Sequence, residues 1–150
     1  MYARNLVQKL ENWENWEGFQ TALVGEADPE LEHTGEQEFE YENPVYQASL
    51  RIEARKKGEA YELEGGLAQP LDIYIAEEEP PHSEFVQQLL TGYEDIIQEH
   101  GMDGFEATGQ PIRVMDFRVE LSDLDDVDRF LSSIDTVSEE IHELHEGYRL

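Results

Sequence analysis

From Val45 to Arg55 apolar and polar residues alternate along the chain, and this pattern restricts the fold more than any other part of the sequence. Successive side chains of a strand point to opposite faces of the sheet, so the alternation predicts a strand with one dry and one wet face. The dry face would hold Tyr46, Ala48, Leu50, Ile52 and Ala54. One face of the resulting sheet is therefore expected to lie in water.

The residues that follow predict a turn and a returning strand. Lys56-Lys57-Gly58 is typical of a tight turn, and Ala60 to Glu64 then resumes an extended pattern, which Gly65-Gly66 would end. Further strands are expected around Phe39 to Tyr41, Leu71 to Ile75, Phe105 to Thr108 and Ile112 to Leu121. Residues 26–38 are polar and contain turn-forming dipeptides, which predicts a long surface loop.

Three stretches have the apolar spacing of an amphipathic helix. The first runs from Leu6 to Trp16, with Gly18 as its stop. The second runs from Phe85 to Ile97, with Ser83 as its N-cap and Gly101 as its stop. The last follows a capping box, Ser122-x-x-Asp125, and continues to Leu144, so it is expected to exceed 20 residues and a length of about 30 Å.

Together these patterns predict one acidic α+β domain over residues 1–150. We expect a mostly antiparallel sheet of about five to seven strands, packed by an N-terminal helix, a central helix and a long C-terminal helix. The chain has no cysteine, which excludes disulfides and thiolate metal sites, and 39% apolar residues suffice for a core.

In this order of elements the chain resembles the small acidic chaperones of type III secretion and their relatives, which share a helix, three strands, a helix, two strands and a helix. The resemblance extends over about the whole chain and lies in the succession of elements alone. It implies a similar α+β architecture, and no site residue follows from it.

The charge is extreme: 36 acids stand against 10 bases, a net charge of −26. This balance excludes non-specific binding to nucleic acids or anionic membranes, because both depend on clustered lysine and arginine. Two explanations remain. The acids are spread along the whole chain, which favours adaptation to a salt-rich host. The alternative is a functional surface that attracts a basic partner.

The sequence indicates no membrane span and no cofactor. No window contains the 18 or more apolar residues that a span requires, so a cytoplasmic protein is expected. Phosphate-binding loops, dinucleotide-binding motifs and a serine elbow are absent, so we assign no catalytic residue and no cofactor.

One pair of histidines is a candidate metal site. His142-Glu143-Leu144-His145 is a residue short of the HExxH spacing, although Glu139, His142 and His145 could share a metal at steps of three residues. The alternative is a solvated helix end. We expect no metal there.

A candidate interaction surface comes from the helical seam of the last helix and from the first helix. Its six residues are Val127, Leu131, Ile134, Ile141, Trp13 and Trp16. The alternative is that these residues pack onto their own sheet, since Val137 and Leu144 broaden the apolar stripe beyond a narrow seam.

These observations favour a non-enzymatic protein-interaction domain, adaptor or chaperone-like, whose partner is another protein or a second copy of the chain. An acidic inhibitor of a basic protein, either an immunity protein or a nucleic-acid mimic, is the alternative. A metal-dependent enzyme using Glu139, His142 and His145 is a further alternative.

Overall fold

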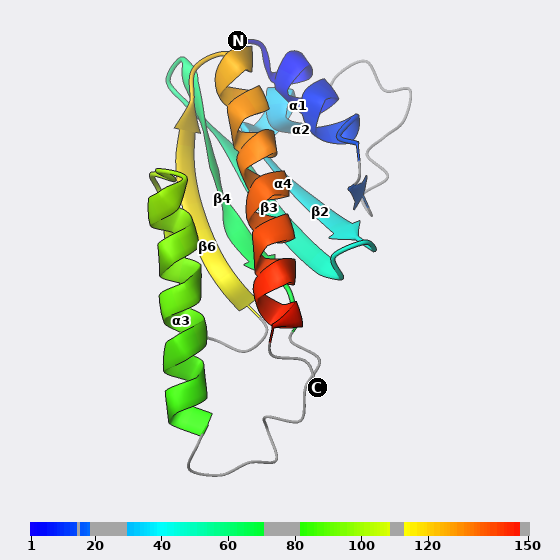
Figure 1. The fold of residues 1–150 in the computed structure, drawn as a ribbon. Coiled ribbons are helices and arrows are strands. Elements are labelled where there is room, and N and C mark those ends of the chain that lie inside the picture. Colours follow the sequence, from blue (N-terminus) through cyan, green and yellow to red (C-terminus); the bar gives the residue numbers. More distant parts are fainter. Residues whose placement is uncertain (15, 19–29, 71–81, 109–112, 148–150) are drawn as a thin grey trace.

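The computed structural model describes residues 1–14, 16–18, 30–70, 82–108 and 113–147, with the backbone alone over 82–86. Four helices and a six-stranded sheet make up this part of the chain (Figure 1). The helices are α1 (Ala3–Glu11), α2 (Glu30–Thr34), α3 (His82–Glu99) and α4 (Leu124–Glu146). The strands are β1 (Glu17–Gly18), β2 (Glu36–Asn43), β3 (Ala48–Lys57), β4 (Ala60–Ala68), β5 (Phe105–Ala107) and β6 (Arg113–Leu121).

The strand order is β1-β2-β3-β4-β6-β5, and every neighbouring pair is antiparallel. With an N-terminal helix, a central helix and a long C-terminal helix packed on this sheet, the α+β prediction is confirmed. None of the helices in the described part of the chain is long and apolar enough to cross a lipid bilayer.

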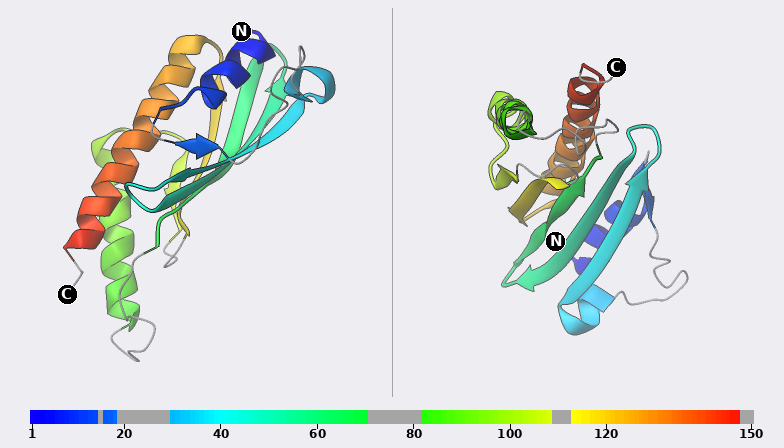
Figure 2. Two further views of the ribbon diagram at one scale, coloured as in Figure 1. Left: turned by 90° about the vertical axis from the view of Figure 1, so that its right-hand side faces the viewer. Right: turned by 90° about the horizontal axis from the view of Figure 1, so that it is seen from below.

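The core lies between one face of the sheet and the helices (Figure 2). The hydroxyl of Tyr41 on β2 donates to the carbonyl of Leu10 on α1 at 2.9 Å, which ties the first helix to the sheet. Phe130 of α4 packs on Phe117 of β6 with ring centroids 5.2 Å apart. The helices therefore cover the inward face, and the outward side chains of β2, β3, β4 and β6 form the opposite face.

From Ala48 onward the alternation has the predicted outcome, but the expected start of the strand at Val45 is wrong, because residues 44–47 form the turn between β2 and β3. Ala48, Leu50, Ile52 and Ala54 are buried, whereas Ser49 and Arg51 between them are exposed. The expected turn at Gly58 joins β3 to β4, with φ of 66° at that glycine.

Two strands are longer than the sequence indicated. The prediction that Gly65-Gly66 ends β4 is wrong, because the strand continues through both glycines to Ala68. Gly65 permits a close approach of β3: a Cβ there would lie 1.8 Å from the carbonyl oxygen of Arg51, so no other residue fits without moving the backbone. The loop expected over 26–38 is also wrong from Glu30 onward, where α2 and the start of β2 lie.

The helix ends differ in detail. The first helix ends at Glu11 and not near Gly18, because Trp13 and Trp16 leave the helix to contact α4. The capping box of α4 is formed by Asp123 and Asp126, one residue later than predicted. Gly101 closes α3 in a left-handed conformation, with φ of 57°, as expected. The strand expected over 71–75 lies outside the described residues.

Candidate functional site

The structure places the six residues of the candidate interaction surface inside one copy of the chain. Val127, Ile134 and Ile141 have no exposed area, and Leu131, Trp13 and Trp16 keep 8% or less. They belong to the single core cluster, which is the position that the packing alternative assigns to them. A docking surface on this structure must therefore use other residues.

The two tryptophans share one carboxylate. Their rings stack with centroids 4.9 Å apart. Trp16 donates its indole N–H to Asp135 at 2.6 Å, and Trp13 donates to the second oxygen of the same carboxylate at 3.4 Å. This contact joins the segment after α1 to the middle of α4.

The fold separates the predicted metal ligands on α4. His145 is buried, with 1% of its surface exposed, and its Nε2 lies 2.7 Å from the hydroxyl of Tyr93 on α3. The ring of His142 lies against Tyr46, with centroids 5.4 Å apart. Within the described residues no group of metal ligands contains His142 and His145 together.

The outward face of the sheet is a second candidate docking surface, and we call it the open sheet face. It contains a hollow of about 670 Å³. The charged residues that line the hollow are Glu40, Glu42, Arg51, Glu53, Glu64, Glu106, Arg113, Asp116 and Arg118. They come from β2, β3, β4, β5 and β6, so the hollow crosses most of the sheet.

Cross-strand ion pairs organise the charges of this face. Arg118 on β6 reaches Glu64 on β4 at 3.0 Å, and Arg55 on β3 reaches the same carboxylate at 3.1 Å. Arg51 pairs with Glu38 on β2 at 2.9 Å. The hydrogen bond from Arg118, with the positive charge of both arginines, holds the pKa of Glu64 below its usual range.

Gly66 of β4 also lines the hollow. Gly66 lies opposite Asp116 in the β4–β6 ladder. A Cβ at Gly66 would lie 3.0 Å from Nε of Arg113, so the guanidinium of Arg113 lies over this position and is itself paired with Asp116 at 2.5 Å. The ion pair of Arg113 with Asp116 thus covers the backbone of Gly66 in this part of the hollow.

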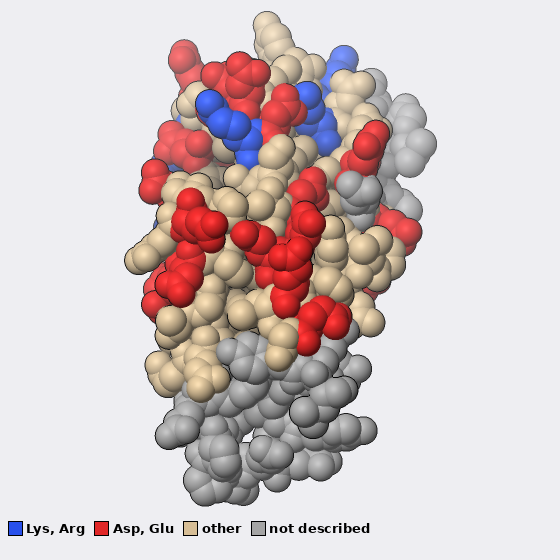
Figure 3. Space-filling view, in the orientation of Figure 1, with Lys and Arg blue, Asp and Glu red and all other residues tan. Residues whose placement is uncertain are grey.

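The helix side of the molecule has a different charge pattern. Figure 3 shows acidic side chains over α3 and α4, with the basic side chains of this view near the N-terminal end of α4. The sequence has no lysine or arginine from residue 58 to 112 or from 130 to 148. The acidic residues of this helix surface include Glu94, Asp95, Glu99, Glu139, Glu140 and Glu143.

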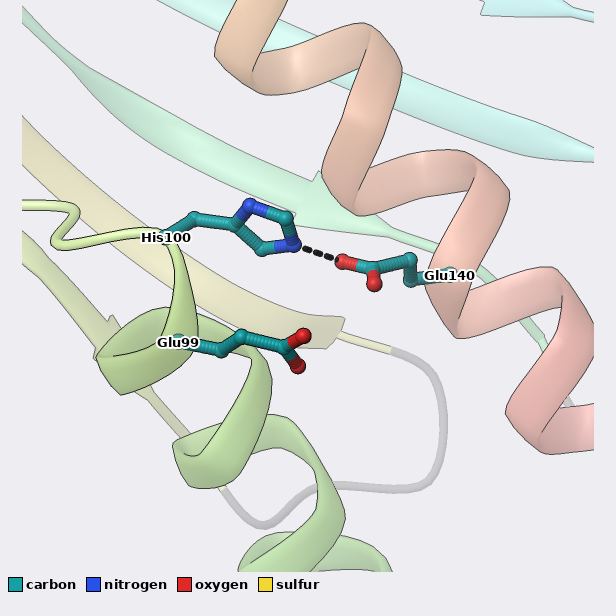
Figure 4. Close-up of side chains that lie close together, drawn as sticks. All are labelled: Glu99, His100 and Glu140. Carbon is teal, nitrogen blue, oxygen red and sulfur yellow. Dashed lines mark hydrogen bonds and ion pairs between the residues drawn. The ribbon is translucent and has the colours of Figure 1, made fainter.

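One group of side chains on the helix side could hold a metal ion. Glu99 and His100 at the end of α3 face Glu140 on α4, and the three ligand atoms all lie within 4.8 Å of one another (Figure 4). Nε2 of His100 contacts a carboxylate oxygen of Glu140 directly. The sequence offered no signal for this group, because 40 residues separate His100 from Glu140 and only the α3–α4 packing brings them together.

No protein-family model, curated protein or solved structure matches the chain.

Proposed function

We propose that the chain is a non-enzymatic protein-interaction domain, adaptor or chaperone-like, whose docking surface is the open sheet face. The observation that supports this most is the charged hollow of about 670 Å³ that crosses five strands on the side away from the helix layer. We place the protein in the cytoplasm as part of the same proposal.

The charge of the hollow indicates the chemistry of the partner. Six acidic residues and three arginines line it, so its net charge is negative although both signs are present. A partner segment with a net positive charge and some acidic side chains would complement it. Such a contact sets specificity and the rate of association more than it sets affinity.

The lowered pKa of Glu64 favours binding over catalysis as the role of the hollow. A general base works best with a pKa near the working pH, whereas the pKa of Glu64 is lowered by Arg118. Among the described residues, the large apolar side chains that are exposed are Tyr2 and Val45 alone. The contact is therefore expected to be polar and to weaken as salt is added.

Site-specific photo-crosslinking in the source cell tests the docking surface. A photoreactive amino acid replaces Ser49, which lines the hollow, or Thr91, an exposed residue of α3 that serves as the control position. We expect a discrete crosslinked species from position 49 that is missing from position 91. A species with twice the mass of the chain would identify a second copy as the partner.

Charge reversal supplies the matched control. Glu42→Lys reverses a negative group of the hollow, and Glu94→Lys makes the same change of net charge on α3, away from it. The proposal expects the crosslink at position 49 to be lost in the first variant and kept in the second. Equal crosslinking of both variants, or crosslinks at position 91 alone, would contradict the open sheet face as the docking surface.

The acidic surface of α3 and α4 favours a second candidate, an acidic inhibitor of a basic protein such as a nuclease or a DNA-binding protein. Glu139→Gln with Glu143→Gln would weaken such binding, whereas Glu42→Lys would not. Binding of basic proteins, measured at several salt concentrations at which circular dichroism shows the chain folded, distinguishes the candidates, since a mimic of nucleic acid loses affinity steeply as salt rises.

A further inference from the structure

We infer that Glu99, His100 and Glu140 bind one divalent transition-metal ion, such as Zn²⁺, between α3 and α4. This site lies on the helix side of the sheet and is separate from the open sheet face of the proposed function. It joins the end of one helix to the middle of another (Figure 4).

The end of α3 holds His100 in a defined position. Its backbone N–H donates to the carbonyl of Ile96 at 3.2 Å, and the N–H of Met102 donates back to Ile97 at 3.1 Å across the left-handed Gly101. Met102 is buried and anchors the chain after this turn. This closure is a Schellman-type helix end, so the imidazole starts from a rigid backbone.

The backbone at Glu140 is also held in a fixed position. Val137 and Ile141 on either side of it are fully buried against the sheet, which fixes this turn of α4. The side chains of Glu140 and His100 retain 29% and 33% of their exposed area, so both remain accessible to solvent. Glu99 is more exposed and completes the group from the last turn of α3.

The distances suit a small ion. Ligand atoms about 2.0–2.1 Å from a tetrahedral zinc lie roughly 3.3 Å from one another. The three atoms here already lie within 4.8 Å, so small side-chain rotations bring them to that separation. Three protein ligands leave a fourth position for water.

The chemistry of the group also favours a transition metal. An imidazole nitrogen with two carboxylate oxygens is a ligand set that Zn²⁺ accepts, whereas Ca²⁺ and Mg²⁺ prefer oxygen alone. Two carboxylates that converge on one point repel each other unless a cation lies between them. The carboxyl end of α3 adds a further attraction for positive charge.

The bound ion would act as a clamp between α3 and α4. The buried contact between Tyr93 and His145 already joins the two helices further along. A metal at Glu99, His100 and Glu140 would add a second attachment, so metal binding should raise the stability of the domain.

Calorimetric titration of the metal-free full chain with Zn²⁺ tests the site. The titration is run in about 1 M potassium nitrate, where a Debye length near 3 Å suppresses diffuse binding to the acidic surface. We expect one ion per chain, with affinity reduced about tenfold or more in His100→Ala and in Glu140→Gln. The controls His142→Ala and Glu139→Gln make the same changes outside the site, and they should bind as the unaltered chain does.

A thermal melt gives an independent readout. At free Zn²⁺ about 100 times the dissociation constant, the melting temperature of the unaltered chain should rise by roughly 5–10 °C, and that of His100→Ala should not. Melting without metal shows whether each variant is folded. Unchanged Zn²⁺ affinity in His100→Ala, absence of a one-site phase, or equal affinity for Ca²⁺ would each overturn the inference. None of these outcomes bears on partner binding at the open sheet face.

Discussion

At the scale of single residues, the carboxylate of Asp135 holds two tryptophan side chains. Its two oxygens accept the indole N–H groups of Trp13 and Trp16. Both indoles are nearly buried, so neither N–H can turn to water without rearrangement of the core. Asp135 therefore determines where the segment after α1 lies on α4.

Replacing Asp135 with alanine should destabilise the domain by about 1.5–3 kcal/mol, because hydrogen bonds to a charged acceptor are lost while their donors stay buried. The melting temperature should fall by about 3–12 °C. Trp13 and Trp16 are the two tryptophans of the chain, so their fluorescence reports the change directly.

Asp135→Asn is the matched control, since it keeps an acceptor oxygen of similar position and should lose less. An alanine variant with the stability and the emission spectrum of the unaltered chain would show that the indoles are held by packing alone.

The two adjacent glycines of β4 offer a prediction at the scale of one strand. A Cβ at Gly65 would meet backbone, 1.8 Å from the carbonyl oxygen of Arg51, whereas one at Gly66 would meet the movable side chain of Arg113. Gly65→Ala should therefore separate β3 from β4 and cost about 3 kcal/mol or more.

Gly66→Ala should cost less than about 1 kcal/mol, because Arg113 can shift. Urea unfolding of the two variants measures both values. Similar losses for both would mean that β3 and β4 adjust easily at Gly65.

The start of α4 carries a prediction of pH dependence. The N–H groups of Ser122 and Asp123 donate to the carboxylate of Asp126, at 2.9 and 3.4 Å, and the side chain of Asp123 accepts from the N–H of Asp126 at 2.8 Å. The hydrogen bond from Ser122 is the largest cause that holds the pKa of Asp126 below its ordinary value of 3.8. A carboxyl with a lowered folded pKa stabilises the fold above its unfolded pKa and loses this contribution as pH falls.

Asp126→Ala should lower stability by about 1 kcal/mol at pH 7, and the difference should shrink as the pH falls below 3.8. Thermal melts of the variant and of the unaltered chain between pH 7 and roughly pH 3 provide the measurement. Asp125→Ala removes a neighbouring acid that makes no cap hydrogen bond, so it controls for the loss of charge. A constant difference at all pH values would contradict the role of the ionised carboxylate.

The helices and strands show which sequence patterns were sufficient to predict an element. Strict alternation in β3 and helical spacing in α4 predicted both elements, because in each one apolar face packs on a single core. Strand β2 was missed in part, since it is rich in glutamate and its inward ends are Gln37 and Asn43, both buried. Its pairing with β3 overrides the weak strand propensity of those residues.

The candidate sites were less predictable, because they depend on contacts between residues that are far apart in the sequence. Apolar spacing identified Val127 and Trp16 as important but could not decide between a partner and the chain's own sheet as the covering surface. The hollow needs five strands in register, and the metal-ligand group needs two helices that meet across 40 residues. Local sequence patterns contain no information about such long-range contacts.

At the scale of the whole molecule, four of the ten basic residues lie on the open sheet face. Arg51, Arg55, Arg113 and Arg118 all lie on β3 and β6, where they pair with acids across the sheet. The helix side holds many acids with few bases. Self-repulsion is therefore partly relieved on the sheet, and much less so on the helices.

From this distribution we expect folding to depend on the screening of charge by salt. A net charge of −26 on one small domain opposes the compact state, and a Debye length of about 3 Å at 1 M salt removes most of that repulsion, whereas one near 10 Å at 0.1 M does not. We predict that the chain is folded in about 3 M potassium chloride and loses its helical circular dichroism as salt is lowered to about 0.1 M.

Substitutions of acids by neutral residues test whether repulsion between acidic side chains causes the loss of folding at low salt. Glu36 and Glu42 are exposed at the two ends of β2, on the same face as Glu38 and Glu40. A variant with Glu36→Gln and Glu42→Gln should remain folded to a lower salt concentration than the unaltered chain, because each change removes one like charge from this row. If the unaltered chain keeps its spectrum and stays monodisperse in light scattering down to about 0.1 M salt, folding does not require screening. Adaptation to a salt-rich host then fails as the explanation, and the acidic charge is left to the recognition of a basic partner.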